Sequence, residues 1–318
     1  MTFFQAVMLH TFVDMSTVPD LGVYNRAFDY IEENIEVNDE FGMEKAFQFM
    51  MLIVGFFIPD FRFFLFVVSF LYLYFNYKTF GKYSPYITFS VIILLLAHFN
   101  QSLFIIRQYL SISILSLSYP YIIEKKFKQF SLVVLIASAI HISSAIFFPV
   151  YFLYWITDRK KYIRFVAAIS VFMFFLSQVL FNYMTSYIDT LAAYSSNYST
   201  GSGNSDFHYS AKGIIMIAIL LLYIVFLKSH VFDFGINRLV LTCSILGIVG
   251  NLFYGNMGTG RMFLSYNAII FIQIPIILMY IKNKFVKLGY AMSMISLYYL
   301  FAYHISSDSM WVYKINFF

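Results

Sequence analysis

The stretch FSLVVLIASAIHISSAIFFPVYFLYWI, residues 130–156, decides how this chain is arranged. It is apolar apart from His141 and a few serines, and basic loops flank it on both sides, at 125–128 and 159–161. Short loops rich in Lys and Arg stay on the cytoplasmic side of a membrane. A single helix would place one of the two loops on the wrong side. A hairpin that turns near 139–144 and returns leaves both loops on the same side.

The hairpin would have two arms of about 13 residues, each about 20 Å long. Neither arm would cross a hydrocarbon core of roughly 30 Å, so we predict a re-entrant hairpin at 130–156. One tilted helix with a misplaced basic loop is the alternative. Non-helical backbone at that depth has to be buried in protein or face a wet cavity.

Composition extends this interpretation to the whole chain. Of 318 residues, 61% are hydrophobic and 12% are charged, against roughly 25% charged in soluble domains. The only cysteine, Cys243, lies in an apolar run, which excludes a disulfide framework. The net charge of +5 comes mostly from lysines in short loops. This pattern indicates membrane topology and argues against nucleic-acid binding.

Apolar segments follow one another along nearly the whole sequence, several of them near the 20 residues that cross a bilayer. They fall at about 46–58, 61–76, 85–99, 102–123, 130–156, 162–182, 212–228, 237–254, 262–281 and 286–303. We therefore predict an all-α fold, a polytopic membrane helix bundle of about 9–11 membrane segments. It forms a single transmembrane domain over 1–318. Residues 1–17 lack the basic start of a signal peptide and resemble the end of a spanning helix that begins earlier.

The basic loops set the orientation. We expect the cytoplasmic side to hold the loops around Lys78, Lys125, Arg159, Lys228 with Arg238, and Lys282. The acidic segment 18–43 and the polar loop 183–211 then lie outside the cell. The loop either closes over a ligand or simply connects two helices, and the acidic segment could also be no more than a solvated surface.

Three ionisable residues lie at membrane segments, where such residues usually mark functional sites. Arg107 shares a helical stripe with Asn100, Ser111 and Ser118, although an arginine near a helix end can also snorkel to the interface. His141 lies at the tip of the hairpin, where it is either a proton acceptor or a hydrogen-bonded structural residue. Arg261 follows the glycines of 255–260 and is otherwise an interfacial anchor.

Two arginines and a histidine gathered toward the outer face would suit a lipid diphosphate, because guanidinium groups bind its oxygens by paired hydrogen bonds. The sequence has no Walker loop, dinucleotide fingerprint, HExxH motif or paired aspartates for a nucleotide-sugar metal site. We therefore expect no cofactor and no metal. The energy would come from an activated membrane substrate or a gradient.

Several short stretches, in this order, carry a resemblance to a known family: DLGVYNRAF at 20–28, EFGME at 40–44, IRQYL at 106–110, 137–144 around His141, and Gly260-Arg261 leading to Tyr266. They resemble the EpsG family of polysaccharide polymerases. The resemblance implies a Wzy-type enzyme with a GT-C-like, all-helical membrane fold. Such an enzyme joins oligosaccharide repeat units carried on undecaprenyl diphosphate into O-antigen, capsule or exopolysaccharide. It works without a metal at the outer face of the bacterial cytoplasmic (inner) membrane.

The resemblance also implies roles for individual residues. Arg107 and Arg261 would stabilise the diphosphate leaving group, and His141 would orient or deprotonate the acceptor hydroxyl. The predicted substrate-binding residues are Asp20, Tyr24, Asn100, Gln108 and Tyr266. The implied partners are lipid-linked oligosaccharide donor and acceptor, membrane lipid and a chain-length regulator.

Two other classes of membrane protein remain open. A transporter or flippase of lipid-linked glycans would also combine intramembrane charges with a broken helix. It would show related halves, and we find no repeat in this sequence. A membrane O-acyltransferase would also use a histidine but needs a path to an acyl donor.

Overall fold

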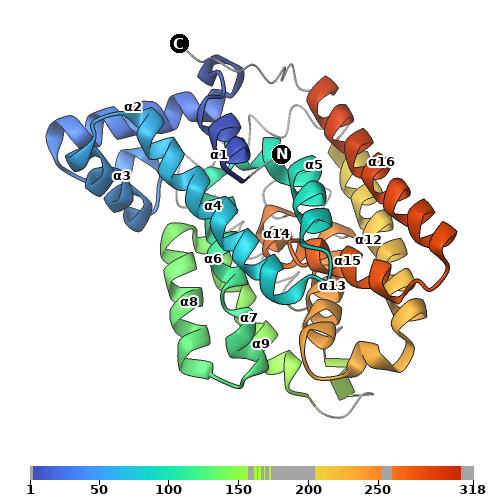
Figure 1. The fold of residues 1–318 in the computed structure, drawn as a ribbon. Helices are drawn as coiled ribbons and strands as arrows, with labels where there is room; N and C mark the ends of the chain where they lie inside the picture. Colours follow the sequence, from blue (N-terminus) through green and yellow to red (C-terminus); the bar gives the residue numbers. More distant parts are fainter. Residues whose placement is uncertain are drawn as a thin grey trace. The chain divides into compact units, whose positions relative to one another are not determined.

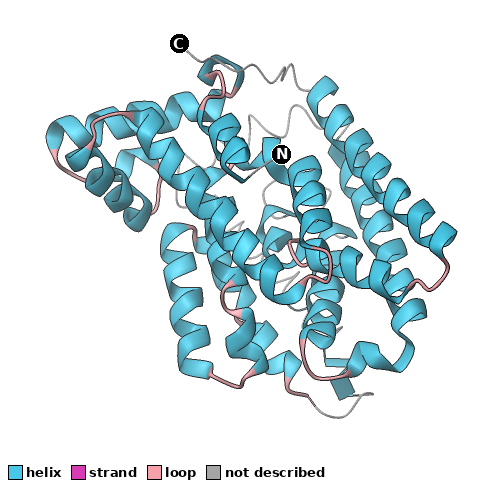
Figure 2. Ribbon diagram, viewed as in Figure 1, coloured by secondary structure: helices cyan, strands magenta, loops and turns pink. Residues whose placement is uncertain are grey.

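The structure is a computed structural model that describes residues 3–156, 161, 162, 164, 165, 168, 172, 205–252 and 260–308. Its described residues form helices and connecting loops and contain no β-strand (Figures 1 and 2). The all-α class expected from the sequence is therefore confirmed for these residues. The GT-C likeness and the number of membrane segments stay predictions.

The chain divides into two compact units, and each is built from separate stretches of sequence. The first unit holds Met1–Ser118, Leu132–Ala145 and Ile281–Phe318, and the second holds Tyr119–Ser131 and Ile146–Tyr280. The single transmembrane domain over 1–318 stays a prediction.

The first unit starts with two segments for which the sequence makes different predictions: 1–17 as the end of a spanning helix, and 18–43 as an acidic segment outside the membrane. Its elements are α1 (Phe3–Thr11), η1 (Met15–Thr17), α2 (Pro19–Asn34), η2 (Asp39–Phe41), α3 (Lys45–Phe57), α4 (Phe61–Tyr83), α5 (Ile87–Phe104), α6 (Ile106–Ser116) and α16 (Lys284–Asp308). Helix α16 packs along α5, where Lys287 Nζ donates to the Tyr86 hydroxyl at 2.6 Å.

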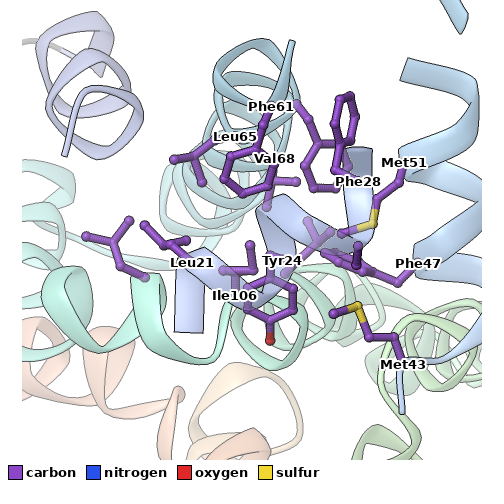
Figure 3. Close-up of a cluster of buried hydrophobic side chains, with 14 of the residues drawn as sticks. Leu21, Tyr24, Phe28, Met43, Phe47, Met51, Phe61, Leu65, Val68 and Ile106 are labelled. Carbon is purple, nitrogen blue, oxygen red and sulfur yellow. The ribbon is translucent and has the colours of Figure 1, made fainter. Parts of the chain in front are cut away.

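The acidic segment 18–43 folds mainly as the amphipathic helix α2. Its apolar residues lie three or four positions apart, which places Leu21, Phe28 and Ile31 on one buried face. This face packs on α3 and α4 in a hydrophobic core, where Phe28 lies near Phe47 and Phe61 (Figure 3). The Phe28 ring is also 5.6 Å from that of Phe64. Each buried ring of this kind contributes about 1.5–3 kcal/mol. This packing holds the start of α3 in place.

Helix α4 is the one described helix that is both long and apolar enough to cross a membrane. Several other apolar helices are shorter, among them Lys45–Phe57 and Ile236–Gly250, and the predicted segment 102–123 is divided. The helix breaks at Ile105 between α5 and α6, and α6 ends before α7 (Tyr119–Ile123). The single stripe expected from Asn100 to Ser118 is therefore wrong. Asn100 lies on α5 and Ser118 lies beyond α6, while Arg107 and Ser111 remain together on α6.

The stretch 130–156 is a helical hairpin. Helix α8 (Phe127–Ile140) ends just before His141, and η3 (Ile142–Phe147) and α9 (Pro149–Tyr154) return. The rings of Phe127 and Phe130 each lie 5.1 Å from that of Tyr151, so the two arms run side by side. The predicted turn near 139–144 is confirmed. Its position in a membrane stays a prediction.

The second unit contains α7, α9, α12 (Ser205–Leu227), η4 (Lys228–Phe232), α13 (Ile236–Leu252), η5 (Gly260–Phe263), α14 (Leu264–Asn267) and α15 (Ile270–Tyr280). Helix α12 begins at Ser205, so the last seven residues of the predicted loop 183–211 are helical. The rest of that loop, 183–204, lies outside the described residues. Gly250 allows α13 to approach Phe263, because an added Cβ would lie 2.2 Å from its ring.

Candidate functional site

Glu44 is the residue around which a charged cluster forms in the first unit. It is the N-cap of α3, with extended backbone (φ −61°, ψ 137°), and its side chain makes no capping hydrogen bond to its own helix. The carboxylate therefore reaches away from α3 toward α6 and the hairpin. The core beneath α2 and α3 fixes this position, since Phe47 on the first turn of α3 is fully buried.

One carboxylate oxygen of Glu44 is paired with Arg107. Its Oε2 accepts from Arg107 Nη1 in an ion pair, and the same nitrogen donates to the Gly42 carbonyl at 3.3 Å. Gly42 has φ +58°, a left-handed conformation that glycine adopts without strain. Arg107 Nε also donates to the Tyr24 hydroxyl at 3.3 Å, and the guanidinium carbon lies 5.8 Å from the centre of that ring. Arg107 thus connects α2, α3 and α6.

The other oxygen of Glu44 contacts the tip of the hairpin. Glu44 Oε1 lies 2.7 Å from His141 Nδ1 and accepts from the backbone N–H of Ile142 at 3.1 Å. The side chains of Glu44, Arg107 and His141 are 20%, 20% and 23% exposed. The three groups are therefore partly withdrawn from solvent and still accessible. We call Glu44, Arg107 and His141 the charged cluster.

Electrostatics keep Glu44 ionised. Burial opposes its charge, but the hydrogen bond with His141 and the positive charge of Arg107 outweigh burial, and the pKa falls from 4.5 to about 2. Burial raises the pKa of the neighbouring Tyr24, against the effect of Arg107. At neutral pH the carboxylate is negative and Tyr24 carries its proton.

Polar side chains fasten the hairpin tip to α6. Gln108 Nε2 donates to Ser143 Oγ at 3.3 Å, and the Ser144 hydroxyl donates to Ser111 Oγ at 2.8 Å. Ser111 in turn donates to the Gln108 carbonyl at 2.7 Å. These bonds hold residues 143 and 144 next to α6, which fixes His141 near Arg107.

The EpsG family model matches residues 1–315, nearly the whole chain. The chain belongs to the EpsG family. Members of this family are Wzy-type polysaccharide polymerases. No curated protein and no solved structure matches the sequence. Family membership and an apolar, helical chain together make this a membrane-associated protein.

In this EpsG-family chain the first unit brings together several of the predicted site residues. Arg107 and His141 belong to the charged cluster, and Tyr24 contacts Arg107. Gln108 contacts Ser143, two residues after His141 at the hairpin tip. Asp20 lies in the first turn of α2, where its charge acts on Tyr24. Asn100 lies on α5, and its side chain is outside the described residues.

The other two predicted residues belong to the second unit. Arg261 is the second residue of η5, and its side chain is outside the described residues. Tyr266 on α14 is fully buried, donates its hydroxyl to the Ile146 carbonyl and stacks on Phe147 at 5.7 Å. Within this unit, Tyr266 joins the end of the hairpin to α14.

In the sequence, Glu44 belongs to a stretch that carries the EpsG resemblance, but that resemblance implies no role for it. A signal was present, because Glu44 is a carboxylate directly before the apolar run 46–58 and just beyond the acidic segment. A charge at such a border is also typical of an ordinary helix start. Only the long-range contacts with Arg107 and His141 distinguish a functional carboxylate from an ordinary helix start.

Proposed function

We propose that this EpsG-family protein polymerises oligosaccharide repeat units carried on undecaprenyl diphosphate into a surface polysaccharide. The observation that carries the proposal is the charged cluster, in which one carboxylate contacts both Arg107 and His141. A cation that can bind a diphosphate and an imidazole that can accept a proton therefore lie next to one another. Both groups would accelerate glycosyl transfer from a lipid diphosphate, the imidazole as a base and the cation on the leaving group.

In the proposed reaction the growing chain on its lipid diphosphate is the donor. A sugar hydroxyl of the incoming lipid-linked unit attacks the anomeric carbon and forms the new glycosidic C–O bond. The bond between that carbon and the diphosphate oxygen breaks, and its electron pair leaves with the diphosphate. The hydroxyl proton passes to His141, and no metal takes part. Arg107 stabilises the negative charge that develops on the leaving group.

The remaining parts of the proposal concern the surroundings of the reaction. In the first unit, Asp20, Tyr24, Asn100 and Gln108 contact sugar or diphosphate, while the roles of Arg261 and Tyr266 stay predictions from the sequence. The protein is a multi-pass, GT-C-like protein of the bacterial cytoplasmic (inner) membrane. Its acidic segment 18–43 and loop 183–211 face outward, where a chain-length regulator would meet it.

Purified protein in lipid nanodiscs, supplied with lipid-linked repeat units, tests the proposal. The wild type should make a ladder of longer chains. Arg107→Ala and His141→Ala should leave single units, with turnover lowered about 10²–10³-fold for the arginine and about 10²–10⁴-fold for the histidine. Matched controls are Arg26→Ala, on the exposed side of α2, and His230→Ala on η4, which should polymerise normally.

Other products would overturn the proposal. Long chains made by both site variants would remove the charged cluster from the reaction. Movement of the lipid-linked unit across the bilayer without chain growth would indicate a flippase. Transfer of an acyl group to a sugar would indicate an O-acyltransferase.

A further inference from the structure

We propose that Glu44 is a positioning residue, which orients the His141 ring and fixes its tautomer so that Nε2 accepts the acceptor sugar's proton. This inference rests on the proposed function. It adds a residue that has no assigned role and states which nitrogen of His141 reacts.

The first observation is the pair of contacts at the hairpin tip. Glu44 Oε1 is 2.7 Å from His141 Nδ1 and 3.1 Å from the Ile142 N–H. Two donors from consecutive residues meet at one oxygen, so both the ring and the backbone that carries it are held. A ring held by Nδ1 alone could still move with its backbone.

The second observation is the charge of the carboxylate. An ionised carboxylate has no proton to donate and acts only as an acceptor. The hydrogen bond to Glu44 therefore requires the proton of neutral His141 to be on Nδ1. Nε2 is then left with its lone pair, which is the form needed by a proton acceptor.

The third observation is that Glu44 has no role in capping its own helix. It occupies the N-cap of α3, yet its side chain makes no capping bond there. Its Oε2 is paired with Arg107 instead. One side chain thus sets the distance between the group that receives the proton and the group that receives the diphosphate charge.

In the reaction, the O–H bond of the acceptor breaks and its proton moves to His141 Nε2. The ring becomes a cation, and the negative charge of Glu44 stabilises that cation while the carboxylate itself stays ionised. The acceptor oxygen uses its electron pair to form the glycosidic bond, and the diphosphate leaves with the pair from the broken bond. Glu44 touches neither substrate.

The pH dependence of kcat/KM distinguishes this role from a structural one. Among the described residues, Glu44 of α3 contacts His141, Arg107 of α6 is paired with Glu44, and Tyr24 of α2 contacts Arg107. Glu44→Gln keeps the shape of the side chain and removes its charge. We expect the acidic limb of kcat/KM to move to lower pH, because the negative charge beside the ring is lost. Turnover should fall about 10²-fold or more.

Glu44→Asp is the second variant and keeps the charge on a side chain one methylene shorter. We expect its kcat per folded molecule to fall, its KM to stay near the wild-type value and its acidic limb to stay in place. Glu40→Gln is the matched control, since Glu40 is exposed and only two residues from Gly42. It should leave kcat, KM and the pH profile unchanged.

Failure of this proposal can be told apart from failure of the proposed function. Wild-type turnover and an unshifted acidic limb in Glu44→Gln would overturn the role of Glu44, while Arg107→Ala and His141→Ala stay inactive. Should Glu44→Gln fail to fold, an unchanged kcat per folded molecule in Glu44→Asp overturns it. Activity in Arg107→Ala and His141→Ala would instead reject the proposed function.

Discussion

Arg107 in the first unit and Arg238 in the second are both withdrawn from water, but their neighbours differ. Arg107 is one-fifth exposed and is paired with Glu44, which also contacts His141. Arg238 at the start of α13 is 4% exposed. Its guanidinium lies 4.4 Å from the centre of the Phe234 ring and 4.6 Å from that of Tyr162, and it donates to the Ile156 carbonyl.

The difference separates the arrangement that we propose to be reactive from a structural one. Ionisable neighbours that are still open to solvent allow Arg107 to exchange its partner for an anionic ligand. Rings and a backbone carbonyl hold Arg238 in a cage that stabilises the packing of α13, and cation–π contacts of this kind are worth about 2 kcal/mol when desolvated. The sequence predicts that Arg238 belongs to a cytoplasmic basic loop, whereas its side chain is buried in the second unit.

The largest effect that would sharpen this comparison comes from Arg107→Lys. Lysine keeps the charge but loses the planar fork that can hold Glu44, Gly42 and a diphosphate at once. We expect turnover per folded molecule to fall about 10²-fold, measured as the rate of chain growth in nanodiscs. Near-normal turnover would mean that only the charge of Arg107 matters.

The counterpart in the second unit is Arg238→Ala. We expect the free energy of unfolding to fall by about 2 kcal/mol, seen as a lower thermal midpoint. Polymerisation per folded molecule should be preserved. A variant with a normal midpoint and no activity would reverse the comparison and assign Arg238 to the reaction.

Lowering the pH should destabilise the first unit, because Glu44 becomes protonated. Its pKa in the folded protein is about 2, below the ordinary value of 4.5. A lowered carboxyl pKa stabilises the fold at pH above 4.5, and this contribution is lost as pH falls from 4.5 toward 2. The wild-type thermal midpoint should therefore drop more over this range than that of Glu44→Gln. Parallel curves for the two proteins would contradict the ion pair.

Gly42→Ala should give the smallest effect. The left-handed φ of +58° costs an alanine about 1–2 kcal/mol, although nothing lies within 4 Å of an added Cβ. We expect a slightly lower thermal midpoint and a several-fold loss of turnover, because the Gly42 carbonyl helps to hold Arg107. Gly22→Ala is the control: it lies in α2 with equal free space, and alanine should stabilise a helix there by about 0.5–1 kcal/mol.

Parts of this arrangement could be predicted from the sequence because they follow from local rules. The basic loops on both sides of 130–156 predict that the chain returns to the side from which it enters, and the structure contains a hairpin there. Its tip carries His141 back to the helix of Arg107, so both residues could be nominated as partners. The buried face of α2, with Phe28 and Ile31, was not predicted, because the acidic residues of 18–43 indicated only a water-facing segment.

Other parts depend on contacts that a local pattern does not contain. A helical wheel assumes an unbroken helix, and the break at Ile105 separates Asn100 from Arg107. Glu44 looked like a residue at an ordinary helix border because its two partners lie 63 and 97 positions further along the chain. Burial of Arg238 depends on Tyr154 and Tyr162, which belong to earlier segments of the second unit.

The discontinuous first unit has a consequence for the order of events during synthesis. Glu44 and Arg107 leave the ribosome before His141, so the carboxylate pairs with arginine first and gains the imidazole later. Helix α16 follows 143 residues after His141, roughly 7–29 s at 5–20 residues per second. Until then α5 lacks the neighbour that α16 provides. A nascent chain stopped before Lys284 would hold Glu44, Arg107 and His141 and leave the face of α5 that α16 covers open to a chaperone or an insertase.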